Sequence, residues 1–187
     1  MQSVKARPVL NVEECDRLSF MPYMFGNDFM LAELQVYALA KKWMPEYEVE
    51  FWHFIRLPEG GGYMMPDCGR VHMVSTESWF DRIVSADAAG IILTSLAVNR
   101  RLAANHDSGN PALTHLYMLR DAQLWNHITL HPECNAIYAA LDRLTTGAAM
   151  PPRRETKKCI HPSPLRRSTW ARITSTTAAA FLANGLI

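Results

Sequence analysis

Apolar residues first recur with a helical period after residue 28. Asn27 or Asp28 can cap a helix there by accepting a backbone N–H bond, and Pro45 ends it because proline cannot continue the hydrogen-bond ladder. Residues 1–19 show no such period and are expected to be extended. The predicted helix places on one face Phe29, Ala32, Val36, Leu39, Ala40 and Trp43.

The pattern changes to that of a strand at Val49–Leu57, which is rich in β-branched and aromatic residues. Pro58 and three glycines then favour a turn, because glycine adopts positive φ angles at little cost. Residues 63–66 can return as the antiparallel partner, and residues 71–76 supply a third strand after a turn at Asp67–Gly69. The simplest arrangement is a three-stranded antiparallel meander.

A helix that is buried on every side is predicted after the strands. Ser85 is a suitable N-cap, and Asp87 lies in the first turn, where a negative charge interacts favourably with the helix dipole. Residues 88–93 are apolar all round, which is typical of a central helix. Gly90 should cost about 0.5 to 1 kcal/mol relative to alanine. We therefore expect another element, such as the sheet, to approach Gly90 closely.

Two more helices are expected after this one. Residues 99–101 should turn the central helix outward, and residues 105–110 should form a polar loop. Asn110-Pro111 begins the third helix, since proline is tolerated at the first helical position. His131–Glu133 begins a fourth helix, which Gly147 closes. The predicted fold is a single compact α+β domain, a three-stranded antiparallel meander packed with about four helices in the order α-β-β-β-α-α-α.

Charge divides the chain at about Gly147. Residues 1–147 hold 12 Lys/Arg and 17 Asp/Glu, a net charge of −5, whereas the remainder holds 7 Lys/Arg and one acid, a net charge of +6. We predict a domain over residues 1–147 and a basic, poorly packed tail rich in Pro, Ser and Thr over residues 148–187. The apolar runs are too short to span a bilayer and no secretory signal is evident, so a cytoplasmic location is expected.

No catalytic or metal-binding motif is evident in the sequence. The four cysteines are scattered, without the paired spacing of a zinc or redox site. His127 and His131 could face one metal, but Ile128 replaces the glutamate of a metalloprotease, and imidazoles near a helix C-terminus are the simpler interpretation. Gly60–Gly62 lacks the Lys-Ser/Thr of a phosphate loop. We predict no catalytic residue, no metal and no cofactor.

Arg120 lies on the apolar stripe of the predicted third helix. A guanidinium is costly to bury unless a carboxylate pairs with it, and the candidate partners are Asp87, Asp121 and Asp142. We predict a buried structural ion pair. The alternative is an arginine that is exposed at the edge of the stripe.

A set of short segments carries a family resemblance. They are Arg17–Pro22 with Phe25-Gly26, Glu33, Phe51–Phe54, Gly61–Pro66, Ser85–Ile91, Leu119–Asp121, His131–Glu133 and Ala139–Asp142. In this order they resemble the antirestriction proteins called ArdB or KlcA, which plasmids and other mobile elements carry. The resemblance covers about residues 17–144 and implies a compact α+β domain that protects incoming DNA from type I restriction enzymes. It implies no catalytic residue, and the tail departs from it.

The leading hypothesis is a non-enzymatic protein that alleviates type I restriction of plasmid or mobile-element DNA, contacting the restriction-modification system directly or indirectly. A net charge of −5 is too small for a DNA mimic, which needs a dense array of carboxylates. The alternative is a DNA-binding accessory protein that uses the basic tail and Arg100-Arg101. A small hydrolase is disfavoured. The surface expected to contact a partner comprises Glu59, Gly60, Gly61, Gly62 and Asp87.

Overall fold

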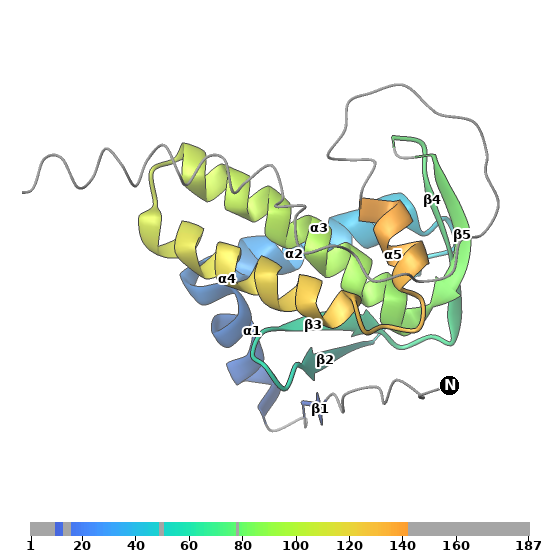
Figure 1. Cartoon of the computed structure of the whole chain (residues 1–187), viewed down its shortest axis with the longest axis horizontal. Coiled ribbons are helices and arrows are strands. Elements are labelled where there is room, and N and C mark those ends of the chain that lie inside the picture. Colours follow the sequence, from blue (N-terminus) through green and yellow to red (C-terminus); the bar gives the residue numbers. More distant parts are fainter. Residues whose placement is uncertain (1–9, 13–15, 49–50, 78, 142–187) are drawn as a thin grey trace, which may run out of the picture. The chain divides into compact units, whose positions relative to one another are not determined.

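The structure of the chain, a computed structural model, describes residues 10–12, 16–48, 51–77 and 79–141. All of them belong to the unit Met1–Leu144, and its α+β class confirms the prediction (Figure 1). The predicted tail at 148–187 and the helix end at Gly147 lie outside the described residues. The elements in chain order are β1 Leu10–Asn11, α1 Arg17–Phe25, the 3-10 helix η2 Gly26–Asp28, α2 Phe29–Trp43, β2 Trp52–Arg56, β3 Gly62–Pro66, β4 Arg70–Ser75, β5 Phe80–Ser85, α3 Ala86–Asp107, α4 Pro111–Ile128 and α5 Cys134–Leu141.

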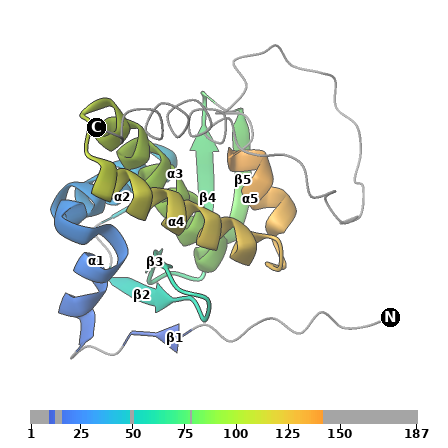
Figure 2. The same ribbon diagram turned by 60° about the vertical axis from the view of Figure 1, so that its left-hand side comes forward.

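The predicted glycine turn joins β2 and β3 into an antiparallel hairpin, in which Phe54 is opposite Met64. Gly60 and Gly61 have φ angles of 95° and 75°, values that favour glycine. The short strand β1 pairs with the other edge of β2, with Leu10 opposite Arg56, so the sheet order is β1-β2-β3. This sheet lies beneath α3 and α4 in the view of Figure 2.

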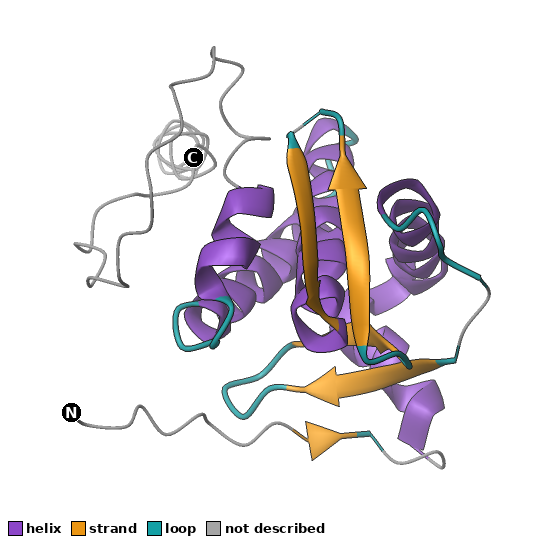
Figure 3. Cartoon of the chain, turned by 90° about the vertical axis from the view of Figure 1, so that its right-hand side faces the viewer, coloured by secondary structure: helices purple, strands orange, loops and turns teal. Residues whose placement is uncertain are grey.

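The predicted meander is wrong in its third strand. Strand β4 forms as predicted, but it pairs with β5 in a separate two-stranded sheet, whose direction crosses that of β2 (Figure 3). The β4–β5 connection is short, so closing it costs little chain entropy. Strand β5 was not predicted because Asp81 and Arg82 interrupt its apolar pattern. Its buried residues are Phe80 and Val84.

Helix α1 contradicts the prediction that residues 1–19 are extended, and it forms although Pro22 lies inside it. Tertiary burial outweighs the missing N–H of Pro22. The buried residues of α1 are spaced at i, i+1, i+4 and i+5, which is a helical signal in the sequence. They are Phe20, Met21, Met24 and Phe25.

Helix α3 is the central element of the described unit, as predicted. Ser85 caps it by accepting a bond from the Ala88 N–H, and residues 88–98 are buried. The helix does not turn outward at 99–101 but continues to Asp107, and Asn105 is buried. At Gly90 the backbone of β3 lies so close that an added Cβ would be 2.4 Å from the Met64 carbonyl oxygen. The predicted close approach of the sheet is therefore confirmed.

The remaining helices form largely as predicted. The Asn110 side chain caps α4 by accepting a 3.2 Å bond from the Leu113 N–H, and Pro111 occupies the first turn. Helix α2 ends before Pro45, although its N-cap residue Asp28 makes no capping hydrogen bond through its side chain. No helix in the described ranges is long and apolar enough to cross a bilayer.

Candidate functional site

The structure places Asp87 at the centre of a polar cluster between β3, α3 and the α4–α5 connection. Its carboxylate accepts a short hydrogen bond from the Tyr63 hydroxyl, and its Oδ2 lies 3.0 Å from Nε2 of His131. Burial opposes ionisation of Asp87, but the bonds from His131 and Tyr63 outweigh it and lower the pKa. Burial and the Asp87 charge raise the pKa of Tyr63 far above its ordinary range.

The same cluster continues through Glu133 to the start of α3. The Glu133 backbone N–H donates to Nδ1 of His131 over 3.0 Å, which assigns the imidazole proton to Nε2, where it can be donated to Asp87. The Glu133 carboxylate accepts from the Ser85 N–H at 3.1 Å and from the Ser85 hydroxyl. The cluster thereby ties three chain segments together, which is a structural role for Asp87.

His127 stacks on Tyr63 with 5.9 Å between ring centroids, and its centroid lies 6.3 Å from that of His131. Burial and the neighbouring His131 lower the pKa of His127, so the imidazole is neutral near neutral pH. Among the described residues, no three His, Cys, Asp or Glu side chains are grouped closely enough to hold a metal ion.

The hairpin tip that was expected to contact a partner lies mostly inside the fold. Gly61 and Gly62 are buried, and the Gln123 side chain covers the tip and donates a 3.1 Å bond to the Glu59 carbonyl. Glu59 is exposed, and the Asp87 side chain keeps 40% of its surface exposed. Gly60 is half-buried. Contact of a partner with this surface stays a prediction.

Arg120 is buried, with 7% of its surface exposed, but its partners differ from those predicted. Its guanidinium donates to the backbone carbonyls of Tyr23 and Met24 at 2.5 Å and 3.2 Å, and to the Gln123 side chain at 2.9 Å. It also stacks on the Tyr23 ring at 4.5 Å. Among the described residues, backbone carbonyls and Gln123 thus take the place of the expected carboxylate. Asp87 is bonded elsewhere, and Asp142 lies outside the described residues.

A buried ion pair does exist, between Asp28 and Arg101. The Arg101 guanidinium donates two bonds of 2.6 Å and 2.7 Å to the Asp28 carboxylate, which also accepts from Tyr117 and Asn105. Burial opposes ionisation of Asp28, but these donors prevail and lower its pKa. The sequence offered no signal for this pair, because its members are 73 positions apart and each had a local explanation.

Asp121, next to Arg120 in α4, provides a pH-dependent prediction. It is buried, its Oδ1 has no hydrogen-bond partner within the described ranges, and burial raises its pKa from 3.8 to about 6. The folded state therefore binds this proton more tightly than the unfolded chain. The contribution of Asp121 to stability should fall by about 2 to 3 kcal/mol as pH rises from about 4 to about 7.

The Asp121→Asn variant should lack this decrease. Because the lowered pKa values of Asp28 and Asp87 act in the opposite direction, the quantity to compare is the difference between variant and wild type at each pH. Urea unfolding across this pH range measures it. An unchanged difference at all pH values would contradict a raised pKa of Asp121.

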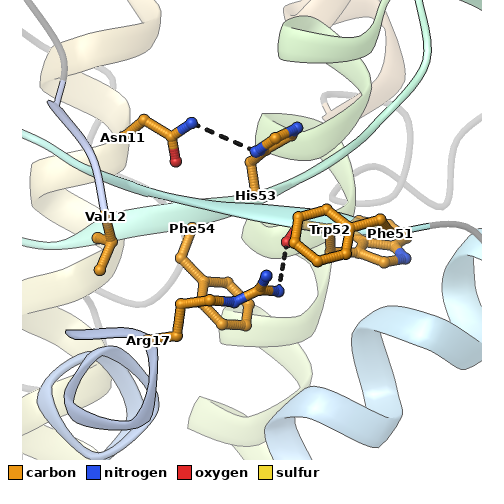
Figure 4. A pocket seen from close by; sticks show the side chains of 7 residues that line it. All are labelled: Asn11, Val12, Arg17, Phe51, Trp52, His53 and Phe54. Carbon is orange, nitrogen blue, oxygen red and sulfur yellow. Dashed lines mark hydrogen bonds between the residues drawn. The ribbon is translucent and has the colours of Figure 1, made fainter. Parts of the chain in front are cut away.

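A pocket with a volume of about 330 Å³ lies at the edge of β2 (Figure 4). It is lined by Asn11 and Val12, by Arg17 of α1, and by residues 51–54. The Arg17 guanidinium donates a 2.7 Å bond to the Trp52 carbonyl oxygen and stacks 4.0 Å from the ring centroid of Phe51. The sequence did not indicate this pocket, because Arg17 and the strand residues meet only in the tertiary structure.

His53 is held in place at the rim of the pocket. Its Nδ1 lies 3.3 Å from the Asn11 side-chain amide, and its Nε2 lies 3.2 Å from the Asp67 carboxylate. If the Asn11 amide nitrogen donates, Nδ1 of His53 is the acceptor and Nε2 carries the proton toward Asp67. In this arrangement His53 is neutral and the adjacent Asp67 carboxylate is negative, so Arg17 is the positive group among the residues that line the pocket.

A model of the family described as antirestriction protein matches residues 45–142. The chain belongs to this antirestriction protein family. It is 73% identical over 138 residues to YubI of Escherichia coli strain K12, covering 73% of this chain and 98% of YubI. It is 34% identical over 135 residues to the antirestriction protein KlcA of Escherichia coli, covering 70% of this chain and 92% of KlcA.

The antirestriction fold is shared with a solved structure from work on the KlcA and ArdB proteins. The TM-score is 0.63 at 35% identity, covering 76% of this chain and 100% of the other. That work describes a novel fold and antirestriction activity against type I DNA restriction systems in vivo but not in vitro. The polar cluster and the pocket both draw on segments that carry the family resemblance in the sequence.

Proposed function

We propose that this protein alleviates type I restriction of incoming plasmid or mobile-element DNA inside the cell. It acts without catalysis, through a protein partner, and not by imitating DNA. The activity described for KlcA and ArdB in vivo but not in vitro supports this mode of action. A protein that simply filled the DNA groove of the restriction enzyme would also inhibit the purified enzyme.

The observation that carries the proposal is the placement of the carboxylates. A DNA mimic needs many surface carboxylates in the place of phosphates. Here Asp28 and Asp121 are buried, while Asp87 and Glu133 are hydrogen-bonded within the polar cluster. The fold therefore uses these acidic groups in internal contacts and not in a surface array. The net charge of residues 1–147 is only −5.

The alternative function is DNA binding, and one of the residues expected to contact DNA is already paired. Arg101 is neutralised by Asp28, so it cannot serve as an unpaired phosphate contact. Arg100 is exposed, and the basic residues of the tail lie outside the described ranges. The alternative then depends on residues 148–187, which a truncation tests directly.

The expected result in cells is that unmodified phage plates on a type I restricting host almost as well as on a non-restricting host when this protein is expressed. Plating efficiency measures the effect, with modified phage as the control for general host damage. A protein truncated after Gly147 should still protect, because only 138 residues of this chain align with 98% of the length of YubI. Full restriction despite abundant folded protein would contradict the proposed function.

The mode of action is tested with purified components. Purified protein should leave DNA cleavage by a purified type I enzyme unchanged. Strong inhibition that excess duplex DNA relieves would indicate a DNA mimic instead. Loss of protection in the truncated protein, with the body still folded, would favour the DNA-binding alternative.

A further inference from the structure

The pocket beside β2 contains a positive charge that the fold uses only in part. Arg17 is pinned by its bond to the Trp52 carbonyl and by stacking on Phe51 and Phe54, at 4.0 Å and 5.0 Å from the ring centroids. A guanidinium has five N–H donors. One is used by Trp52, and the others have no partner in the part of the chain that the structure describes.

Helix stability does not explain why a positive charge is present at this position. Arg17 lies in the first turn of α1, where the helix dipole disfavours a cation. The contacts with Phe51 and Phe54 are cation–π interactions and use part of the charge. The in-plane N–H bonds other than the one to Trp52 are still available to a ligand at the pocket.

The shape and lining of the pocket indicate the chemistry of that ligand. A guanidinium stacked on aromatic rings presents its remaining N–H bonds in its own plane, which suits a carboxylate with two oxygens. A single main cation matches a carboxylate monoanion better than a doubly charged phosphate. Phe51, whose surface is 53% exposed, offers an apolar wall for a ring beside the carboxylate.

We infer that this pocket is a recognition site for a protein segment in which a carboxylate adjoins an aromatic side chain. Arg17 binds the carboxylate, and the exposed Phe51 contacts the ring. The volume of about 330 Å³ is at the lower end for ligand sites and fits one such group. The inference rests on the proposed function in so far as the segment belongs to the protein partner.

Phenylacetate is the probe for this chemistry, phenylacetamide is its uncharged counterpart, and thymidine monophosphate represents a nucleic-acid ligand. Proton–nitrogen NMR titration of the full chain should show saturable shifts for phenylacetate at the Arg17 side chain, the Asn11 amide and the Phe51 backbone N–H. Phenylacetamide should bind about tenfold more weakly, because it cannot form charge-assisted hydrogen bonds. Absence of these shifts, equal binding of phenylacetamide, or tighter binding of thymidine monophosphate would overturn the inference.

Two variants separate recognition from folding. Arg17→Gln keeps a donor for the Trp52 carbonyl and should weaken phenylacetate binding about tenfold or more. Arg82→Gln makes the same charge change at an exposed position of β5, in the other sheet, and should bind like the wild type. Unchanged binding by a folded Arg17→Gln variant would overturn the inference. So would binding that appears only after Glu13 and Glu14 are changed to Gln, since the chain would then supply its own carboxylate.

The plating assay then decides whether the pocket serves restriction alleviation. The Arg17→Gln variant should lose protection, whereas Arg82→Gln should keep it. Full protection by an Arg17→Gln protein that no longer binds phenylacetate would show that the partner docks elsewhere. If the wild type itself gives no protection, the proposed function is wrong. The NMR titration still tests, independently of that result, whether the pocket binds a carboxylate.

Discussion

A Gly90→Ala variant is expected to lose about 2 kcal/mol or more of folding stability. The added Cβ would be 2.4 Å from the Met64 carbonyl oxygen and 2.9 Å from the Met65 Cα, both of them backbone atoms of β3. Overpacking of this kind costs about 1 to 3 kcal/mol and sometimes more. The better helix propensity of alanine returns only about 0.5 to 1 kcal/mol.

The neighbours of Gly90 cannot move away easily. The Met64 N–H donates a 3.0 Å bond to the Thr94 hydroxyl, and Met64 is also opposite Phe54 in the β2–β3 ladder. A shift of β3 would therefore disturb both α3 and the sheet. Urea denaturation measures the loss. Gly69→Ala is the control, since a Cβ there would meet nothing within 4 Å. A Gly90→Ala protein as stable as the wild type would contradict the packing of α3 on β3.

An Asp28→Asn variant is expected to lose about 3 kcal/mol. The change keeps the shape of the side chain but leaves the Arg101 guanidinium without its carboxylate, and removing one partner of a buried pair typically costs about 3 to 5 kcal/mol. The lower value is expected because the Arg101 side chain is 18% exposed, so water can solvate part of the remaining charge. Tyr117 and Asn105 also lose a charged acceptor.

The double variant Asp28→Asn with Arg101→Gln should be less destabilised than the sum of the two single changes, because no unpaired charge remains. Equilibrium unfolding of the four proteins gives this coupling. Glu77→Gln is the matched control: it breaks the Lys42–Glu77 pair, in which both side chains are 49% exposed, and should change stability little. Additive effects at Asp28 and Arg101 would contradict a buried pair.

The polar cluster and the pocket suggest why the family segments are spread along the chain. Tyr63, Asp87 and His131 come from three separate segments of the resemblance and meet in one hydrogen-bonded cluster. Arg17 and the strand at 51–54 come from two others and meet at the pocket. The cluster fastens β3, α3 and the α4–α5 connection together, whereas the pocket is the proposed recognition site. A partner is therefore sought at the pocket first.

Local chemistry in the sequence was sufficient to predict several elements. The Ser85 and Asn110 caps, the glycine turn between β2 and β3, the apolar periods of α2 and α4 and the continuous apolar run of α3 act over a few residues. Such features are decided by backbone geometry and nearby hydrogen bonds, so a single sequence reveals them. Gly90 was informative for the same reason, because its cost within a buried helix required a close neighbour.

Only the tertiary structure decided the pairings between distant residues. A buried Arg120 paired with a carboxylate was the favoured prediction, but backbone carbonyls of α1 accept from Arg120, and the pair with a carboxylate is that of Arg101 with Asp28. Helix α1 forms in spite of Pro22 because four apolar side chains gain burial, which a local rule cannot weigh. Strand β4 pairs with β5 because that short hairpin closes at little entropic cost. The sequence by itself thus determined the family, the α+β class and most local elements, whereas the partners of each buried charge, the second sheet and the Arg17 pocket depend on which segments the fold brings together.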